Sequence, residues 1–405
     1  MTTEPLTTLF SNLITIKSHQ PEIISGKFLA TIIKLLTLLE KSPGGPYYNE
    51  TKELDLKLNT LIATWLALFN IHLRPLNSFL RKNKIKIKED RIKTSVSKPT
   101  NIIYDRITRR AQKFMATLGP ELNKLGTKAL TRLLQNDTDQ QILLLPLFFK
   151  KSLGRNGQSI PPKTITDLGL ANLYLWLAYT IYDSIIDNEQ PAATIPLANI
   201  FFKEYLFLNH HIFKNYPTAL SLLSQIIDAM EKANIREIHN RGIARKLKMN
   251  YGNQAILAEK SFAHAFSPLG LLIILGYKAD SAEISYLKLF FKHYLIARQL
   301  NDDAHDWETD LKAGYFNSIS LQIAKFTSGQ INYKRWRQIF WDRIFMSSQQ
   351  QILKHTKRAR KYLARLSLIE DKEYLRIFIE AIELGAKKSL QNQIAITELT
   401  KAKLL

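Results

Sequence analysis

Acidic side chains gather within nine residues of the chain, at Asp302, Asp303, Asp306, Glu308 and Asp310. Asp302, Asp306 and Asp310 are four residues apart, so on an α-helix each step turns by only about 40° and the three share one face. Like charges at this spacing destabilise a helix, and a bound cation would reverse that repulsion. Carboxylate oxygens suit Mg²⁺, which binds one or two carboxylates together with water and substrate phosphates. The spacing therefore indicates a metal site, with a solvated acidic face as the alternative.

A second pair of aspartates, Asp183 and Asp187, is also separated by four residues. It ends an apolar helical pattern over 163–188, which Pro191 stops. Alone, this pair is as compatible with a surface feature as with a site. Together, the two acidic helix ends predict carboxylates that face each other across the mouth of an apolar cavity, where Mg²⁺ would connect them to substrate phosphates.

The acidic run resembles a known motif. Written as Gln299-x-x-Asp302-Asp303-x-x-Asp306, it is similar to the second aspartate-rich motif of the trans-polyprenyl diphosphate synthases, in the class I isoprenoid synthase superfamily. The acids at i, i+4 and i+8 also resemble the looser metal motif of class I terpene cyclases. The Asp302/Asp306 pair resembles that of squalene and phytoene synthases. The motif indicates the superfamily without choosing the branch.

The pair at Asp183 and Asp187 resembles the first aspartate-rich motif of the same superfamily only in part. Polyprenyl synthases carry a doubled Asp, a third Asp four residues on, and a following Arg pair. Here Ser184 replaces the second Asp, and no Arg pair follows. The Asp-Ser-x-x-Asp form is nearer to the squalene and phytoene synthases, although Ile186 stands where those carry an acid. This divergent first motif weakens an assignment to chain elongation.

The resemblance implies ionisation of a prenyl diphosphate with the help of Mg²⁺, or of Mn²⁺ in its place. It implies that Asp183, Asp302 and Asp306 bind the metal directly, and that Asp187, Asp303 and Asp310 bind it or support its ligands. It further implies diphosphate binding by Lys260 and Arg298. Lys260-Ser261 resembles the Lys-Thr step of polyprenyl synthases, and Arg298 lies one turn before Asp302. The alternatives are a solvated lysine and an arginine that neutralises the acidic cluster.

The function expected from the resemblance is polyprenyl transfer or chain elongation, with a prenyl diphosphate as substrate. A terpene cyclase and a coupling enzyme of the squalene or phytoene synthase type remain alternatives. An alternative of another class is a catalytically inactive helical protein that binds prenyl lipids or a membrane. The degenerate first motif keeps that last alternative open.

Helical periodicity runs through almost all of the 405 residues, and glycines and prolines fall between the apolar segments. We therefore expect an all-α fold: an isoprenoid-synthase-like helical bundle over 96–405, preceded by an accessory N-terminal helical region over 1–95. A basic, polar stretch at 81–97 marks the boundary. The absence of cysteine excludes disulfides and thiolate metal sites.

The net charge of +22 is compatible with nucleic acid, an anionic membrane surface or phosphorylated small molecules as partners. The sequence carries no nucleic-acid-binding motif, so we expect no nucleic-acid partner. Basic stretches at 81–97 and 354–365 leave a peripheral membrane contact open, and a homodimer is open as well. Without a signal-peptide pattern or an apolar run of about 20 residues, the expected location is cytoplasmic, with membrane association as the alternative.

Overall fold

The computed structural model describes residues 98–137, 140–186, 190–241, 254–327 and 331–401. The expected accessory region at 1–95, the basic stretch at 81–97 and Asp187 lie outside these residues. The chain divides into two units, one of residues 94–387 and one of residues 1–93 with 388–405. All of the described candidate site residues belong to the first unit.

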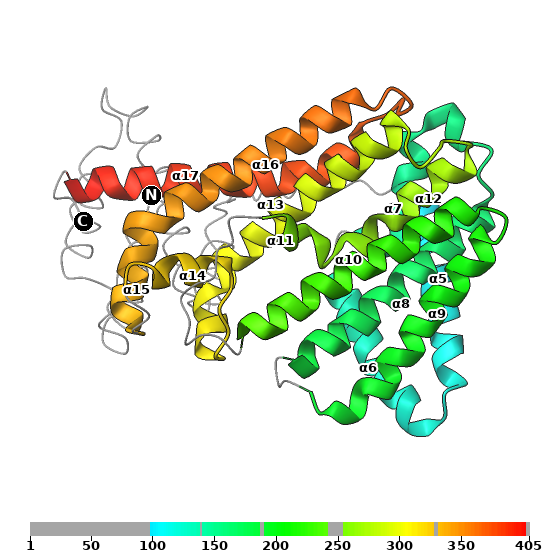
Figure 1. Cartoon of the computed structure of the whole chain (residues 1–405), viewed down its shortest axis with the longest axis horizontal. Helices are drawn as coiled ribbons and strands as arrows, with labels where there is room; N and C mark the ends of the chain where they lie inside the picture. Colours follow the sequence, from blue (N-terminus) through cyan, green and yellow to red (C-terminus); the bar gives the residue numbers. More distant parts are fainter. Residues whose placement is uncertain (1–97, 138–139, 187–189, 242–253, 328–330, 402–405) are drawn as a thin grey trace, which may run out of the picture. The chain divides into compact units, whose positions relative to one another are not determined.

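All regular structure in the described ranges is helical, which confirms the predicted all-α fold (Figure 1). The first half comprises α5 (Lys98–Ala116), α6 (Pro120–Asn136), α7 (Gln141–Ser152), η1 (Gly154–Gly157), α8 (Pro162–Ile186), η2 (Ala192–Thr194), α9 (Ile195–Phe213) and α10 (Pro217–Arg241). The second half comprises α11 (Ala255–Glu259), η3 (Phe262–Ala265), α12 (Phe266–Ile274), α13 (Ala282–Lys312), α14 (Ser318–Ala324), α15 (Tyr333–Ile339), the π-helical turn η4 (Phe340–Ile344), α16 (Phe345–Arg365) and α17 (Glu373–Lys401).

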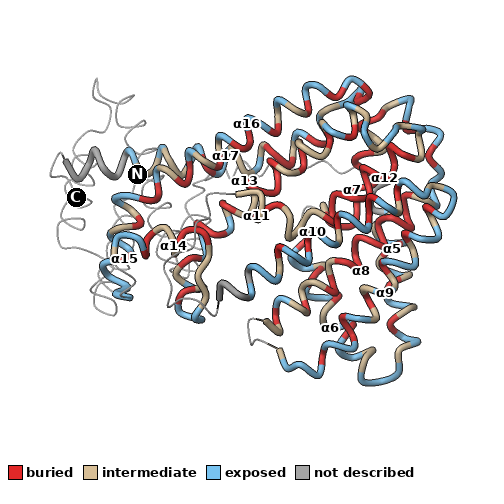
Figure 2. Tube along the Cα trace, viewed as in Figure 1, coloured by how far each residue is buried: buried red, intermediate tan, exposed pale blue. Residues whose placement is uncertain are grey.

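Helix α8 is apolar on almost every side and is therefore buried along most of its length, as Figure 2 shows. It packs against α5, α7 and α9. Gly169 allows one close approach, because a Cβ there would lie 2.5 Å from Ile107 Cδ1 and 2.6 Å from the Leu143 carbonyl oxygen. Asp183 therefore lies near the C-terminal end of a helix that is largely buried.

Helix α13 carries the second acidic group at its C-terminal end. It begins at the N-cap Ser281, whose hydroxyl accepts a hydrogen bond from the Ile284 N–H at 3.3 Å. It ends before Gly314, whose φ of +89° favours glycine. Along its length α13 packs against α16, α11 and α14.

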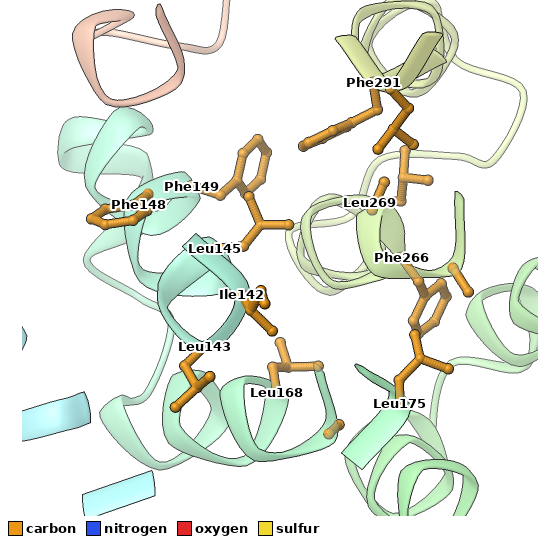
Figure 3. Packing of buried hydrophobic residues seen from close by; sticks show 14 of the residues in the cluster. Ile142, Leu143, Leu145, Phe148, Phe149, Leu168, Leu175, Phe266, Leu269 and Phe291 are labelled. Atoms are coloured by element: carbon orange, nitrogen blue, oxygen red, sulfur yellow. The ribbon is translucent and has the colours of Figure 1, made fainter. Parts of the chain in front are cut away.

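The main core lies where α7, α8, α12 and α13 converge. Figure 3 shows Leu145 of α7, Leu168 of α8, Phe266 and Leu269 of α12 and Phe291 of α13 packed together. A second, smaller core forms at the C-terminal end of α13, where Trp307 and Leu311 meet side chains of α14, α15 and η4. The acidic end of α13 is therefore anchored by a core of its own.

Candidate functional site

The two acid-bearing helices are connected by one cation–π contact. The Arg298 guanidinium of α13 lies over the Trp176 ring of α8, 5.3 Å from its centroid. Trp176 is seven residues, nearly two turns, before Asp183, and Arg298 is four residues before Asp302, so each pair shares one helix face. Both helices run toward the lower left in Figure 1. The contact therefore turns the acid-bearing faces of α8 and α13 toward each other.

The short helix η3 lies between α8 and α13 and packs against both. Its His264 is buried and meets the edge of Trp176, with ring centroids 5.5 Å apart. Burial, with a smaller contribution from the positive charge of Arg298, lowers the pKa of His264 to about 3. His264 is therefore neutral at physiological pH and serves as an uncharged spacer between the two helices.

A small cavity of about 10 Å³ lies behind Arg298. It is lined by Gln141, Leu145, His264, Ala265, Phe291, Tyr294, Leu295, Arg298 and Phe378. A volume of this size admits about one water molecule, whereas ligand pockets usually exceed about 300 Å³. His264 lines this space, and its buried Nδ1 has no hydrogen-bond partner among the described residues. The cavity thus suits a bound water and is far too small for a prenyl chain.

Asp137 contributes a further charge near Arg298. The Asp137 carboxylate lies at the start of α7, where its Oδ1 accepts a hydrogen bond from the Ile142 N–H at 3.2 Å. Burial raises the pKa of Asp137 to about 6, while hydrogen bonds from the α7 backbone and the charge of Arg298 act in the opposite direction. Arg298 therefore faces the interior, between the Asp137 carboxylate and Asp302, and its charge acts on both.

Asp302 and Asp306 are the exposed acids of the run. They lie one turn apart on α13, and none of the described side chains donates a hydrogen bond to either carboxylate. Desolvation by nearby protein atoms raises the pKa of Asp302, Arg298 lowers it, and the like charges of Asp303 and Asp306 raise it. A cation at this face would relieve that repulsion.

Asp303 has a different environment, because its side chain points into the protein and the residue is only 6 % exposed. Its Oδ1 accepts a hydrogen bond from Gln299 Nε2 at 2.7 Å. Its Oδ2 accepts from the Ser318 backbone N–H at 3.1 Å and from the Ser318 hydroxyl. Burial raises the pKa of Asp303, while these hydrogen bonds and the charge of Lys260 lower it. Both oxygens therefore have protein partners, and Oδ2 attaches the start of α14 to α13.

The remaining acids of the run also contact protein groups. Asn317, the N-cap of α14, donates from Nδ2 to Asp310 Oδ2 at 2.8 Å and to the Asp303 carbonyl at 3.0 Å. Glu308 accepts two hydrogen bonds from Arg337 of α15 and forms an ion pair with Lys312 at 2.8 Å. Arg337 is the main reason that the pKa of Glu308 falls to about 2. These acids stabilise the end of α13.

Lys260 follows the last residue of α11, and α11 packs against α13. Its charge acts on Asp303, so the structure places this predicted diphosphate-binding lysine beside the acidic helix. The lysine is partly buried. Nothing in these contacts distinguishes a diphosphate-binding role from a charge that balances the acids, and the role stays a prediction.

The first motif is represented by Asp183, which is exposed near the end of α8. The next residue, Ser184, is 5 % exposed and faces the interior. The position at which polyprenyl synthases carry a second aspartate is therefore buried here, which gives a physical reason for an uncharged residue. The position of Asp187 lies outside the described residues.

The described residues contain no group of three or more His, Cys, Asp or Glu side chains arranged to hold a metal ion. The exposed pair Asp302 and Asp306 nevertheless supplies the oxygen ligands that Mg²⁺ prefers, and Mg²⁺ commonly binds one or two carboxylates with substrate phosphates completing its shell. The residues present therefore fit an ion that arrives with its substrate better than a permanently bound one.

Several solved structures share the arrangement of helices seen in this chain. A geranylgeranyl pyrophosphate synthetase from the archaeon Geoglobus acetivorans matches with a TM-score of 0.52 and 13% identity, over 70% of this chain and 98% of that one. The chain has the isoprenoid-synthase fold. A heptaprenyl diphosphate synthase from Staphylococcus aureus matches with a TM-score of 0.53 and 13% identity, over 70% and 97% of the two chains. A farnesyl diphosphate synthase from T. brucei gives a TM-score of 0.50 at 13% identity, over 69% and 95%.

No family model and no curated protein matches the chain. The resemblance to the trans-polyprenyl diphosphate synthases is thus confirmed at the level of the fold. Among the described helices, none is long and apolar enough to cross a membrane.

Sequence reasoning missed three residues that shape the site: Trp176, His264 and Asp137. A signal was present for two of them. Trp176 precedes Asp183 by seven residues on the same helix face. Asp137 lies four residues before α7 begins, where an acid interacts favourably with a helix N-terminus. His264 had no such signal, because its role depends on η3 lying between two distant helices.

Proposed function

We propose that the chain is a Mg²⁺-dependent enzyme that acts on prenyl diphosphates, by polyprenyl transfer. The observation that carries this proposal is the contact of Arg298 with Trp176, because it turns the helix faces of Asp183 and Asp302 toward each other. The isoprenoid-synthase fold supports the same function, since the similar solved structures bear the names of prenyl diphosphate synthases.

In this proposal Asp302, Asp306 and Asp183 hold the metal, together with Asp187, which follows Asp183 by four residues in the sequence. When bound, Mg²⁺ would neutralise the charge of the departing diphosphate. Lys260 adds a positive charge beside the acidic helix and would bind the diphosphate.

The other residues of the predicted site have supporting roles in this proposal. Asp303 and Asp310 hold α14 in place through Ser318 and Asn317, and they orient the acidic helix end rather than bind metal. Arg298 neutralises the neighbouring carboxylates from the interior and fixes α13 against α8. Its predicted contact with diphosphate requires that the guanidinium also reach outward, and it stays a prediction.

A second candidate is a catalytically inactive protein that binds prenyl lipids. One observation favours it, because the first motif lacks its doubled aspartate. A protein that only binds prenyl lipids would retain the fold but would not need metal-binding aspartates at both helix ends.

Pyrophosphate release distinguishes these candidates. The full chain is incubated with C10 to C20 allylic diphosphates, with and without isopentenyl diphosphate, in the presence of Mg²⁺ or a chelator. Transfer predicts pyrophosphate and a longer prenyl product only with isopentenyl diphosphate and metal. Release without isopentenyl diphosphate would favour a cyclase. Turnover that survives exhaustive chelation would exclude the metal-dependent reading.

Substitution of the two helix ends tests the shared site. We expect Asp302→Ala and Asp183→Ala each to lower kcat/KM by at least about a hundredfold, roughly 2.7 kcal/mol of transition-state stabilisation. Asp228→Ala, which removes an exposed aspartate of α10, is the matched control and should change little. Normal turnover by Asp183→Ala would show that the first motif is a bystander.

A further inference from the structure

Large apolar side chains are exposed at the connection between α14 and α15. Phe326 is 50 % exposed, Ile331 50 % and Tyr333 38 %. Single exposed apolar residues are ordinary on protein surfaces, but several close together usually mark an interaction site. These three lie within eight residues of the chain, on either side of 328–330.

The exposure does not result from a poorly packed segment. Trp336 of α15, the helix that begins at Tyr333, is fully buried in the second core. Its ring centroid lies 6.1 Å from that of Phe316. The Asn332 side chain caps α15 by accepting a hydrogen bond from the Arg335 N–H at 3.1 Å. The Lys312 ammonium group lies over the Tyr333 ring, 5.9 Å from its centroid, and this cation–π contact connects Tyr333 to the last turn of α13. Tyr333 therefore begins a well-anchored helix, and most of α15 is coloured as exposed in Figure 2.

Positive charge surrounds these apolar side chains. Lys325, Lys334, Arg335 and Arg343 are all exposed. From residue 318 to residue 346 the sequence holds five basic residues and a single acid, Asp342. A surface that combines aromatic and aliphatic side chains with lysine and arginine matches the interface of a bilayer, where apolar groups enter the headgroup region and cations meet anionic lipids.

We propose that this surface, the α14–α15 corner formed by Lys325, Phe326, Ile331, Tyr333, Lys334 and Arg335, docks on membranes that contain anionic lipid. Charge complementarity favours this occupant over the chain's own residues 81–97, which are also strongly basic and would be repelled. The corner adjoins the acidic end of α13, since the ammonium group of Lys312, the last residue of α13, lies 5.9 Å from the Tyr333 ring centroid. Docking would hold the candidate site close to the lipid surface.

Vesicle binding by the full chain tests the proposal. Co-sedimentation is measured with phosphatidylcholine vesicles and with vesicles containing 30 mol % phosphatidylglycerol, at about 0.05 M and about 0.5 M salt. We expect binding only to the anionic vesicles, weakened by salt. Each basic residue near such a surface contributes roughly 1 kcal/mol, a factor of about five. Lys334→Glu with Arg335→Glu should therefore weaken partitioning at least about thirtyfold. Lys124→Glu with Lys128→Glu, on exposed positions of α6, is the control with the same charge change.

A site-specific probe tests insertion of the apolar side chains. Because the chain has no cysteine, Phe326→Cys can be labelled alone with a polarity-sensitive dye, and Leu125→Cys on α6 provides an exposed control. We expect the emission at position 326 to shift to the blue on addition of anionic vesicles, with no shift at position 125. The labelled variants should keep the circular dichroism and melting temperature of the parent, since both positions are exposed.

Several outcomes would overturn the proposal. The proposal is wrong if the full chain does not bind anionic vesicles at low salt. It is also wrong if the α6 variant (Lys124→Glu with Lys128→Glu) loses as much binding as the corner variant (Lys334→Glu with Arg335→Glu). A blue-shifted emission at position 326 without vesicles would mean that another part of the chain covers the corner. A change in oligomeric state by light scattering in the corner variant, with vesicle binding unchanged, would identify a protein interface instead.

Discussion

Neighbouring aspartates of α13 should respond in opposite ways to removal of their carboxylates. Asp303 is buried and accepts hydrogen bonds from Gln299 Nε2, the Ser318 N–H and the Ser318 hydroxyl. Asp302 is exposed and accepts none from the described residues. Asp303→Ala should therefore unfold more easily, whereas Asp302→Ala should keep its stability and lose activity.

The size of the stability effect follows from the contacts. Each hydrogen bond to a charged group contributes at least roughly 1.5 kcal/mol, so removing three costs about 4.5 kcal/mol. The loss leaves the buried Ser318 hydroxyl without its partner, which argues against a smaller value. For Asp302→Ala the expected change is within about 0.5 kcal/mol, because removing one of several repelling carboxylates from a solvated face does not destabilise the helix.

Urea denaturation followed by circular dichroism measures the free energy of unfolding, and pyrophosphate release measures activity in the same preparations. Ser318→Ala provides an independent variant, because it removes one of the hydrogen bonds and leaves every acid in place. We expect it to cost roughly 1–2 kcal/mol. If Asp303→Ala were as stable as the parent and as inactive as Asp302→Ala, the anchoring role of Asp303 would be wrong and metal binding would be the better interpretation.

Further predictions address the interior of the site and the chain boundary. Trp176→Leu and Arg298→Lys should be coupled by about 1–2 kcal/mol in a double-mutant cycle of stability, because their cation–π contact is largely desolvated. Additive effects of the two substitutions would show that α8 and α13 are held together by other contacts. The buried His264 stays neutral in the folded protein, with a pKa of about 3, while the unfolded chain takes up a proton below about pH 6.5. Its contribution to stability is therefore complete above that pH and declines as the pH falls, by about 2 kcal/mol at pH 5. Urea titrations should show that the free energy of unfolding declines less with falling pH in His264→Gln than in the parent. Identical pH profiles for the two proteins would contradict the burial of His264. A chain that begins at Lys98 should still unfold cooperatively when melting is followed by circular dichroism, and a molten product would mean that residues 1–95 belong to the same core.

Much of the fold could be predicted from the sequence, because the helix boundaries have local causes. Gly119-Pro120 separates α5 from α6, and Pro162 opens α8 at a position where a missing N–H costs nothing. The all-apolar pattern of α8 indicates an interior helix. Such signals act over a few residues, so they survive even though the chain shares only 13% identity with the structures whose fold it has.

The exposed acids of the site could be predicted too, but their division of roles could not be read from charge alone. Asp302 and Asp306 share the outer face of α13, as their spacing predicts. Asp303 falls instead in a stripe with Trp307 and Leu311, at i, i+4 and i+8, and this stripe faces the second core. The stripe was visible in the sequence, and it was the only local indication that one carboxylate points inward.

Other features depend on contacts between distant parts of the chain. Arg337 meets Glu308 across 29 residues, and no local pattern pairs them. The inward direction of Arg298 depends on Trp176 and on the position of η3. The exposed corner at Phe326 and Ile331 likewise cannot be inferred from sequence, because both residues would ordinarily be assigned to a core.

The burial of Ser184 connects the divergent first motif to the chemistry proposed for the site. An aspartate at this position would place a second negative charge in the interior beside Asp183, and an unpaired buried charge costs several kcal/mol. The packing of α8 therefore restricts this part of the helix end to a single outward carboxylate. In the proposed site, Asp183, Asp302 and Asp306 offer few protein ligands to an ion, so a bound diphosphate would supply much of the coordination. Metal binding and substrate binding would then be strongly coupled, and affinity for Mg²⁺ alone would be weak.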